Sequence, residues 1–410
     1  MEAAEVLRAA KFLLPGKGVD LGAWAVVACD QFTSEEKYWK ELDAFVGEKP
    51  SSLRVILPEI YLSRKAELAP KAAEQMKTYL KEGVLGESAA GYILTVRATP
   101  YSPRRIGLTA AVDLEAYDYS PGSRALVRAT EGTIAERIPP RLEIRRDAPA
   151  EFSHIMLLYD DESRSVNEKL YAARAQYQKI YDFDLNMGGG HLEGYFIPEN
   201  EKIPQMFASL VSPERMEKKY GDKAPFLFAA GDGNHSLATA KEHWNALKKT
   251  LGEEERKTHP ARFCLAEIVN VYDEGIRFEP IFRFVSGVDK ADFENGLKKT
   301  DAAFSLIEGE THAGKLSLPE SIAKADEYIA DYLAKKGGSV DYVHGEENLR
   351  ALVAANARSS GVCFAPLKKG ELFAYVAKKG VLPKKTFSMG EGVEKRYYLE
   401  GKRITYAEKE

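Results

Sequence analysis

The apolar residues of this chain follow strand-like runs in some segments and helix-like spacings of three and four in others, which predicts a mixed α/β protein. Runs bounded by turn residues predict strands at 92–96, 106–114, 153–159, 264–271 and 281–284, the first two as an antiparallel pair. Helical spacing predicts helices at 64–82, 166–180, 203–220 and around 322–329. We therefore expect mixed and antiparallel sheets with helices packed on them.

The segment 226–247 carries the strongest functional signal. The apolar run 226–230 predicts a buried strand, and Leu237, Ala240, Trp244 and Leu247 fall on one face of a helix. The turn between them places an acid, an imidazole and a hydroxyl where helix N–H groups attract anions and glycines allow close approach. It therefore predicts an anion or phosphate site, with Asp232 and His235 as catalytic candidates and a ligand-binding set of Gly231, Gly233, Asn234 and Ser236.

The same turn has a purely structural interpretation. In that interpretation the two glycines only form the bend, Ser236 caps the helix, and Asp232 and His235 bond to nearby backbone. The sequence leaves this alternative open.

A second glycine-rich segment precedes a histidine. Gly188, Gly189 and Gly190 supply backbone that can wrap a ligand closely, and His191 and Glu193 would share one side of a following strand. Both residues are catalytic candidates, although a flexible connector with a solvated histidine is equally compatible with the pattern. The spacing is no strong metal signature, so we predict no metal site.

Every basic residue from Arg97 to Arg146 is an arginine. Because arginine binds phosphate and carboxylate in a bidentate, planar manner, the segment predicts an anion site, with Arg128, Arg137 and Arg141 as the best candidates. Glutamates in the same stretch allow the alternative of surface Arg–Glu pairs. The isolated histidines, including His154, have no partner at ligand spacing, and we interpret them as structural or surface residues. For Tyr397 and Tyr398 we favour a place in the core.

Composition limits the class of protein. The formal net charge of −4 and pI of about 6.1 give no basic field for nucleic acid. The chain contains no apolar run long enough to cross a bilayer, and residues 1–14 do not form a signal peptide. Three scattered cysteines, Cys29, Cys264 and Cys363, give no disulfide framework or zinc motif. We expect a soluble cytoplasmic protein without a membrane partner.

The chain resembles, nearly end to end, the bacterial and archaeal family catalogued as domain of unknown function 1015. The resemblance is carried by residues 105–108, 117–120, 128–133, 154–161, 231–240 and 280–283, and is strongest in the Asp-Gly-Xaa-His stretch that begins at Asp232. It is specific as to family and implies no settled activity.

The turn is also similar to the motif of the ParB and sulfiredoxin superfold, where a glycine-containing sequence opens a helix whose backbone and arginine hold phosphate. Members known as free-serine kinases use a similar Asp-Gly-His-His-Arg stretch to hold a nucleotide. By position, Asp232 and His235 match the acid and the second histidine, whereas Asn234 and Ser236 replace the first histidine and the arginine. Lys241 or the arginine-rich segment would have to supply the missing charge.

This likeness implies a ParB-like core with a C-terminal α/β part over 151–410, after an arginine-rich N-terminal α/β part over 1–150. The acidic stretch 253–260 is a further candidate boundary.

For function, the resemblance implies a small-molecule enzyme with an anion site, and more specifically a nucleotide-dependent phosphotransferase that uses ATP or ADP with Mg²⁺. Asp232 or Glu193 would then be the base for an acceptor hydroxyl, and His235 would hydrogen-bond a phosphate oxygen. One alternative is a non-catalytic metabolite-binding or regulatory protein. The other is a ParB-like DNA-binding protein, which the lack of a helix-turn-helix and of a basic helix face disfavours.

Overall fold

The computed structural model describes residues 1–27, 35–132, 135–200 and 202–406. Contacts divide the chain into two compact units: unit 1 comprises Met1–Ile276 and the segment from Gly392 onward, and unit 2 comprises Arg277–Glu391. Unit 2 is therefore inserted into the sequence of unit 1, and the chain returns to unit 1 after it. This division lies elsewhere than the boundary expected at residue 150, which stays a prediction.

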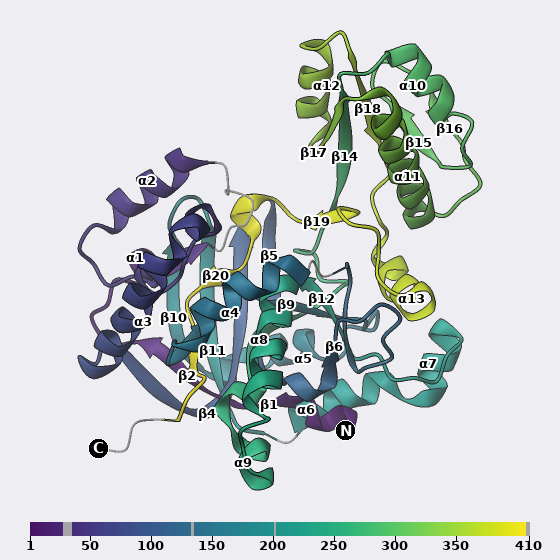
Figure 1. The fold of residues 1–410 in the computed structure, drawn as a ribbon. Helices are drawn as coiled ribbons and strands as arrows, with labels where there is room; N and C mark the ends of the chain where they lie inside the picture. The colour runs from purple at the N-terminus through teal and green to yellow at the C-terminus, as the bar shows by residue number, and fades with distance from the viewer. Residues whose placement is uncertain (28–34, 133–134, 201, 407–410) are drawn as a thin grey trace. The chain divides into compact units, whose positions relative to one another are not determined.

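Unit 1 is built on one large mixed sheet (Figure 1). Three neighbouring pairs on its main path, β6–β7, β7–β12 and β9–β13, are parallel and the others are antiparallel. The mixed α/β class expected from the sequence is confirmed. In spatial order the path runs β6 (Tyr117–Asp118), β7 (Val127–Ala129), β12 (Phe228–Asp232), β9 (Met156–Tyr159), β13 (Phe263–Asn270), β5 (Ser102–Asp113), β4 (Leu85–Thr99), β2 (Ala10–Pro15), β21 (Gly401–Arg403) and β8 (Ala150–Phe152).

Two further elements attach to this path. The short strand β1 (Leu7–Arg8) pairs with β5, and the hairpin of β10 (Gln178–Leu185) and β11 (Gly190–Pro198) pairs with β4 through β11. Strand β4 pairs with β2 over Leu85–Gly91 and with β11 over Gly91–Ala98. It therefore belongs to the main path and also carries the β10–β11 hairpin. A separate two-stranded pair is formed by β3 (Val26–Val27) and β20 (Tyr397–Tyr398).

The helices of unit 1 cover this sheet. Helix α8 (Asn234–Leu247) buries Leu237, Ala240 and Trp244, three of the four residues whose spacing predicted it, and packs against α4 (Ile138–Arg146). None of the helices in the described residues is both long and apolar enough to cross a bilayer. The others are α1 (Leu21–Trp24), α2 (Glu36–Val46), α3 (Lys65–Lys81), α5 (Asn167–Ala172), α6 (Lys202–Ala208), α7 (Pro213–Tyr220) and α9 (Glu253–Thr258).

The helix expected at 166–180 is wrong in its second half. Helix α5 ends at Ala172, a 3₁₀ turn covers Arg174–Gln176, and the chain then forms β10. From Tyr181 to Leu185 burial alternates residue by residue, which is the period of a strand. The apolar side chains of this segment fit both the helical period and the strand period, and the segment forms a strand because it pairs with β11.

The helix expected at 203–220 is interrupted. Helix α6 ends at Ala208, and α7 begins at Pro213 after a 3₁₀ turn. Proline has no N–H to continue the first helix but fits the first position of the next, where Ser212 caps it.

Unit 2 is a smaller antiparallel sheet with helices on both faces. Its path runs β16 (Thr311–His312), β15 (Phe304–Leu306), β18 (Ser359–Cys363), β14 (Phe278–Ser286) and β17 (Ser339–His344), with β19 (Phe387–Met389) on the first part of β14. Val285 packs with α10 (Lys290–Leu297) and α11 (Leu318–Lys336), whereas Phe282 and Phe284 pack with α12 (Glu346–Ala354). Helix α13 (Lys369–Lys379) completes the unit.

Candidate functional site

The turn between β12 and α8 adopts a conformation that only glycine tolerates well. Gly233 has φ of 77° and is the N-cap of α8, so no side chain of its own can cap the helix and none does. A Cβ at this position would lie 3.1 Å from the Cα of Ile155. The Gly233 N–H donates to Oδ1 of Asp232 at 2.8 Å. Gly233 therefore offers no side chain to the N–H groups in the first turn of α8.

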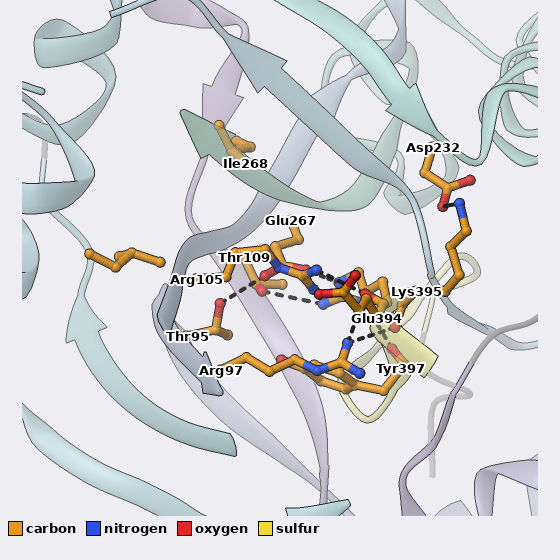
Figure 2. A network of polar contacts seen from close by, with 12 residues as sticks. Thr95, Arg97, Arg105, Thr109, Asp232, Glu267, Ile268, Glu394, Lys395 and Tyr397 are labelled. Atoms are coloured by element: carbon orange, nitrogen blue, oxygen red, sulfur yellow. Dashed lines mark hydrogen bonds and ion pairs between the residues drawn. The ribbon is translucent and has the colours of Figure 1, made fainter. Parts of the chain in front are cut away.

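Asp232 forms an ion pair with a residue from the far end of the chain. Lys395 Nζ lies 3.1 Å from Asp232 Oδ2, and the two side chains are 12% and 28% exposed (Figure 2). Burial raises the pKa of the Asp232 carboxyl, but the charges of Lys395 and His154 and two hydrogen bonds outweigh burial, so the pKa lies below its usual range. Asp232 is thus an ionised carboxylate at neutral pH, with a cation beside it.

Arg97 on β4 holds the segment that carries Lys395. Its buried guanidinium donates to the carbonyl of Gly189 at 2.8 Å and to that of Val393 at 2.6 Å. It also donates to the carbonyl of Lys395 at 2.6 Å (Figure 2). One side chain thus joins the glycine-rich loop before β11 to the segment at 393–395.

Further buried charges surround this segment. Arg396 lies 3.2 Å from Glu267 on β13 and 2.9 Å from Glu400, and Thr95 donates to Glu267 at 3.1 Å. Burial raises the pKa of Glu267, but Arg105, Arg396 and Arg97 outweigh it and lower the pKa. The network keeps Glu267 ionised inside the unit and fixes the position of the returning chain.

A cavity of about 190 Å³ lies beside the first turn of α8. Ser236 and Thr239 of α8 line it, together with two ion pairs: Arg141–Glu59 at 2.8 Å and Arg145–Glu151 at 2.5 Å. The rest of its wall is largely apolar and comes from residues 55–59 and Leu62 and from Trp39, Met76, Ile144, Phe152, Ile155 and Tyr398 among others. The cavity thus combines two arginine–glutamate pairs with an apolar lining.

His154 lies in the wall of this cavity between two hydroxyl groups. Its Nδ1 is 2.8 Å from the hydroxyl of Tyr398, and its Nε2 is 3.4 Å from Oγ of Ser236. The rings of His154 and Tyr398 meet edge to face with centroids 5.4 Å apart. Sequence reasoning set both residues aside, since no spacing relates them to Ser236; the nearest signal was the position of His154 just before an apolar run.

The arginines singled out in the sequence lie in different surroundings. Arg141 lines the cavity, where it forms an ion pair with Glu59. The Nη1 group of Arg141 also donates to the carbonyl of Arg137. Arg128 instead stacks over Phe226 at 4.3 Å and donates to backbone carbonyls, and burial lowers its pKa to about 10. The structure brings only Arg141 of these three candidates to the cavity wall.

Lys241, expected as a possible substitute for the missing arginine, is engaged further along α8. Its ammonium donates to the carbonyl of Leu114 at 2.8 Å and lies 3.9 Å from Glu115. Burial lowers the pKa of Lys241, and Glu115 partly opposes this effect. The cation that lies beside Asp232 is Lys395, which the sequence did not indicate.

His191 and Glu193 lie on the β10–β11 hairpin and share one side of it, as expected. His191 Nδ1 lies 2.7 Å from Asp184 and its Nε2 lies 2.9 Å from Asp182, while Lys179 bridges Asp182 and Glu193 at 2.6 and 2.7 Å. Hydrogen bonding to Asp184 is the main cause that raises the pKa of His191. One ligand atom from each of Asp182, His191 and Glu193 lies within 4.8 Å of the others, so the group can offer metal ligands, although the Lys179 ammonium already neutralises part of it.

The hairpin and the Asp232 turn are linked indirectly. Within the described residues, hydrogen bonds and an ion pair lead from Gly189 through Arg97 to Lys395 and on to Asp232, and His191 and Glu193 make their own contacts on the hairpin. His235 lies in the first turn of α8, where its carbonyl accepts from Thr239 at 2.7 Å. Asn234 is buried, and its Oδ1 has no hydrogen-bond partner among the residues that the structure describes.

A family model described as protein of unknown function (DUF1015) matches residues 13–396. No curated protein matches the chain.

Several solved structures share low similarity with this chain. A conserved hypothetical protein from Pyrococcus furiosus has 12% identity and a TM-score of 0.35, covering 70% of this chain and 93% of its own. A free serine kinase in complex with AMP has 11% identity and a TM-score of 0.38, with coverages of 72% and 92%. SbnI from Staphylococcus aureus, with a C-terminal truncation, has 10% identity and a TM-score of 0.33, with coverages of 69% and 82%. At these TM-scores, function is argued from the residues of this chain alone.

Proposed function

The chain belongs to the DUF1015 family of unknown function, and we propose that it is an enzyme acting on an anionic small molecule, more specifically a nucleotide-dependent phosphotransferase. The observation that carries the proposal is the ion pair of Asp232 with Lys395 at the uncapped start of α8. It places a carboxylate, a cation and helix N–H groups around one turn.

These groups match the needs of phosphoryl transfer. The transition state spreads negative charge over phosphoryl oxygens, and catalysis consists mainly of positioning and electrostatic stabilisation. The N–H groups at the start of α8 and the Lys395 ammonium supply positive potential without a conformational change. Asp232, ionised because its pKa is lowered, accepts a hydrogen bond from an acceptor hydroxyl and aligns it.

The neighbouring cavity supplies room for the small molecule. Arg141 and Arg145 give its wall two guanidinium groups, and its apolar part suits a carbon skeleton. Both arginines are paired with glutamates, so the cavity also offers carboxylates to a cationic group of a ligand. This combination favours a ligand with both an anionic and a hydrogen-bonding part.

Mg²⁺ would accompany the nucleotide. Because Mg²⁺ keeps several waters and takes most of its other ligands from phosphate, one protein carboxylate at the turn is enough, and Asp232 is suited to that role. When bound, the ion would neutralise charge on the phosphate oxygens.

The first test is ligand-induced thermal stabilisation with ATP, ADP, AMP, pyrophosphate and sulfate, each with and without Mg²⁺. A ligand at a hundred times its Kd adds about 2.7 kcal/mol of stability, which is roughly 4–5 °C for a unit of about 300 residues. We expect stabilisation by one class of nucleotide, followed by transfer of its phosphoryl group to free amino acids or small alcohols in a radiolabel assay.

The matched variant is Asp232→Asn. We expect it to retain stabilisation by the nucleotide without Mg²⁺, to lose the additional effect of Mg²⁺, and to lose turnover by at least about a hundredfold, in line with loss of a positioned base. Unchanged turnover would refute the role of Asp232. Binding without transfer to any acceptor would favour the alternative of a metabolite-binding regulator, and absence of binding to every phosphate compound would refute the anion site.

A further inference from the structure

Three side chains from distant parts of the chain form a continuous hydrogen-bonded series in the cavity wall. Ser236 lies in the first turn of α8, His154 in the loop before β9, and Tyr398 on β20. The distances are 3.4 Å from Ser236 Oγ to His154 Nε2 and 2.8 Å from His154 Nδ1 to the Tyr398 hydroxyl. All three side chains are partly exposed, and all three line the same cavity.

We propose that Ser236 is a nucleophile activated by His154, that Tyr398 orients the imidazole, and that the cavity accepts an electrophilic phosphoryl compound. The arrangement has the three parts that activate a serine: the hydroxyl, a base within reach, and a third group that fixes the base. It goes beyond the proposed function, because direct transfer from a nucleotide to an acceptor needs no nucleophile on the protein.

The roles proposed for Ser236 and Tyr398 determine which nitrogen of His154 carries the hydrogen. For His154 Nε2 to accept the serine proton, Nδ1 carries the hydrogen and donates it to the Tyr398 oxygen. The imidazolium that forms is stabilised by the ionised Asp232, whose carboxylate interacts electrostatically with His154. Distances of this kind are commonly long before substrate binds and shorten in the complex.

The reaction is a substitution at phosphorus. Ser236 Oγ forms a bond to phosphorus, the bond from phosphorus to the leaving group breaks, and the leaving group departs with that bond's electron pair. The hydroxyl proton of Ser236 moves to Nε2 of His154 and later to the leaving group or to water. The product is a phosphoseryl enzyme, which water or a second hydroxyl compound then cleaves.

The position of Ser236 also distinguishes it from its neighbours. Thr239 lies one turn further along α8, and its hydroxyl donates a hydrogen bond to the carbonyl of His235 at 2.7 Å. Ser153 lines the same cavity, but its Oγ accepts from the N–H of Ile155 at 3.1 Å. Among the serine and threonine hydroxyls that line this cavity in the described residues, only that of Ser236 lies within hydrogen-bonding distance of an imidazole nitrogen.

The test uses the full chain and diisopropyl fluorophosphate, a phosphoryl electrophile that reports an activated serine without knowledge of the substrate. Intact-mass measurements over time should show one diisopropylphosphoryl group per chain, and peptide mapping should place it on Ser236. We expect His154→Ala to slow labelling by about a hundredfold or more and Tyr398→Phe by a smaller factor. Ser209→Ala is the control, at an exposed serine that is not among the residues lining this cavity and whose hydroxyl donates to the carbonyl of Met206 at 2.7 Å, and it should label like the wild type.

Several results would overturn the proposal: no adduct on the wild type, an adduct on another residue, or equal labelling rates for the wild type and His154→Ala. Peptide mapping of the wild type needs no variant, so the test stands even if a substitution impairs folding. Tryptophan fluorescence checks the variants, because Trp24, Trp39 and Trp244 all lie in unit 1. Since labelling requires no nucleotide, its failure and the failure of phosphotransfer are separate results.

Discussion

The ammonium of Lys395 lies 3.1 Å from the carboxylate of Asp232, so the returning C-terminal segment brings a positive charge to the turn that opens α8. The cation beside this turn thus comes from a distant part of the chain, and no local sequence pattern indicates it.

Lys395→Met tests this pair through stability. The folded-state pKa of Asp232 is depressed, so the pair's contribution is present above the unfolded pKa of about 4 and is lost as the pH falls through the folded pKa. We expect the variant to lose about 1–3 kcal/mol of unfolding free energy at pH 7 and less at pH 3. Urea denaturation followed by tryptophan fluorescence measures this, and an equal loss at both pH values would contradict the assignment.

Gly233→Ala tests the conformation of the turn. Alanine at φ of 77° is strained, and its Cβ would meet the backbone of Ile155 at 3.1 Å, so we expect a loss of about 1–2 kcal/mol together with weaker anion binding. The control is Gly252→Ala at the N-cap of α9, where φ is −68° and a Cβ meets nothing within 4 Å. Similar losses for both variants would show that the turn does not require glycine.

Arg97→Lys tests the connection between the glycine-rich loop and segment 393–395. An ammonium cannot reproduce the planar set of donors, so buried carbonyls of Gly189 and Val393 lose their partners. We expect a loss of about 3 kcal/mol or more in unfolding free energy. Arg124→Lys, at an exposed ion pair with Asp222, should change it by less than about 0.5 kcal/mol.

His191 should titrate at a higher pH than an ordinary histidine. Asp184→Asn removes the main cause of the raised pKa, and the NMR titration midpoint of His191 should then move downward. Because the folded-state pKa is raised, this interaction stabilises the hairpin below the unfolded pKa of about 6.5 and is lost as the pH rises through the folded value. An unchanged midpoint in Asp184→Asn would show that Asp184 does not contact the ring in solution.

Much of the local structure was predictable from the sequence. The strand before Gly231, the helix face of Leu237, Ala240 and Trp244, and the β4–β5 pair all follow from apolar periodicity. The predicted helix ran on to residue 180 because Tyr177 and Ile180 fit helical spacing equally well. Residues 178–180 instead belong to β10, whose pairing with β11 is a tertiary contact.

The candidate site was only partly predictable. Asp232 and Ser236 stood out because they share one short turn, which is local information. His154 joins them through the order of strands in the sheet, and Lys395 and Tyr398 join them through the return of the chain after unit 2. None of these three residues is indicated by its spacing in the sequence. The arginine-rich segment was a real compositional signal, but its members serve the cavity wall, a buried network and an aromatic contact separately.

The return of the chain to unit 1 has a consequence for biosynthesis. On the ribosome, the strands and helices of residues 1–276 emerge well before Lys395, Arg396 and β21. Until they arrive, the Asp232 carboxylate lacks the Lys395 ammonium, Glu267 lacks Arg396, and β2 and β8 lack the strand that lies between them. The nascent chain therefore cannot form the Asp232–Lys395 pair ahead of time, and a product of interrupted translation is left without it.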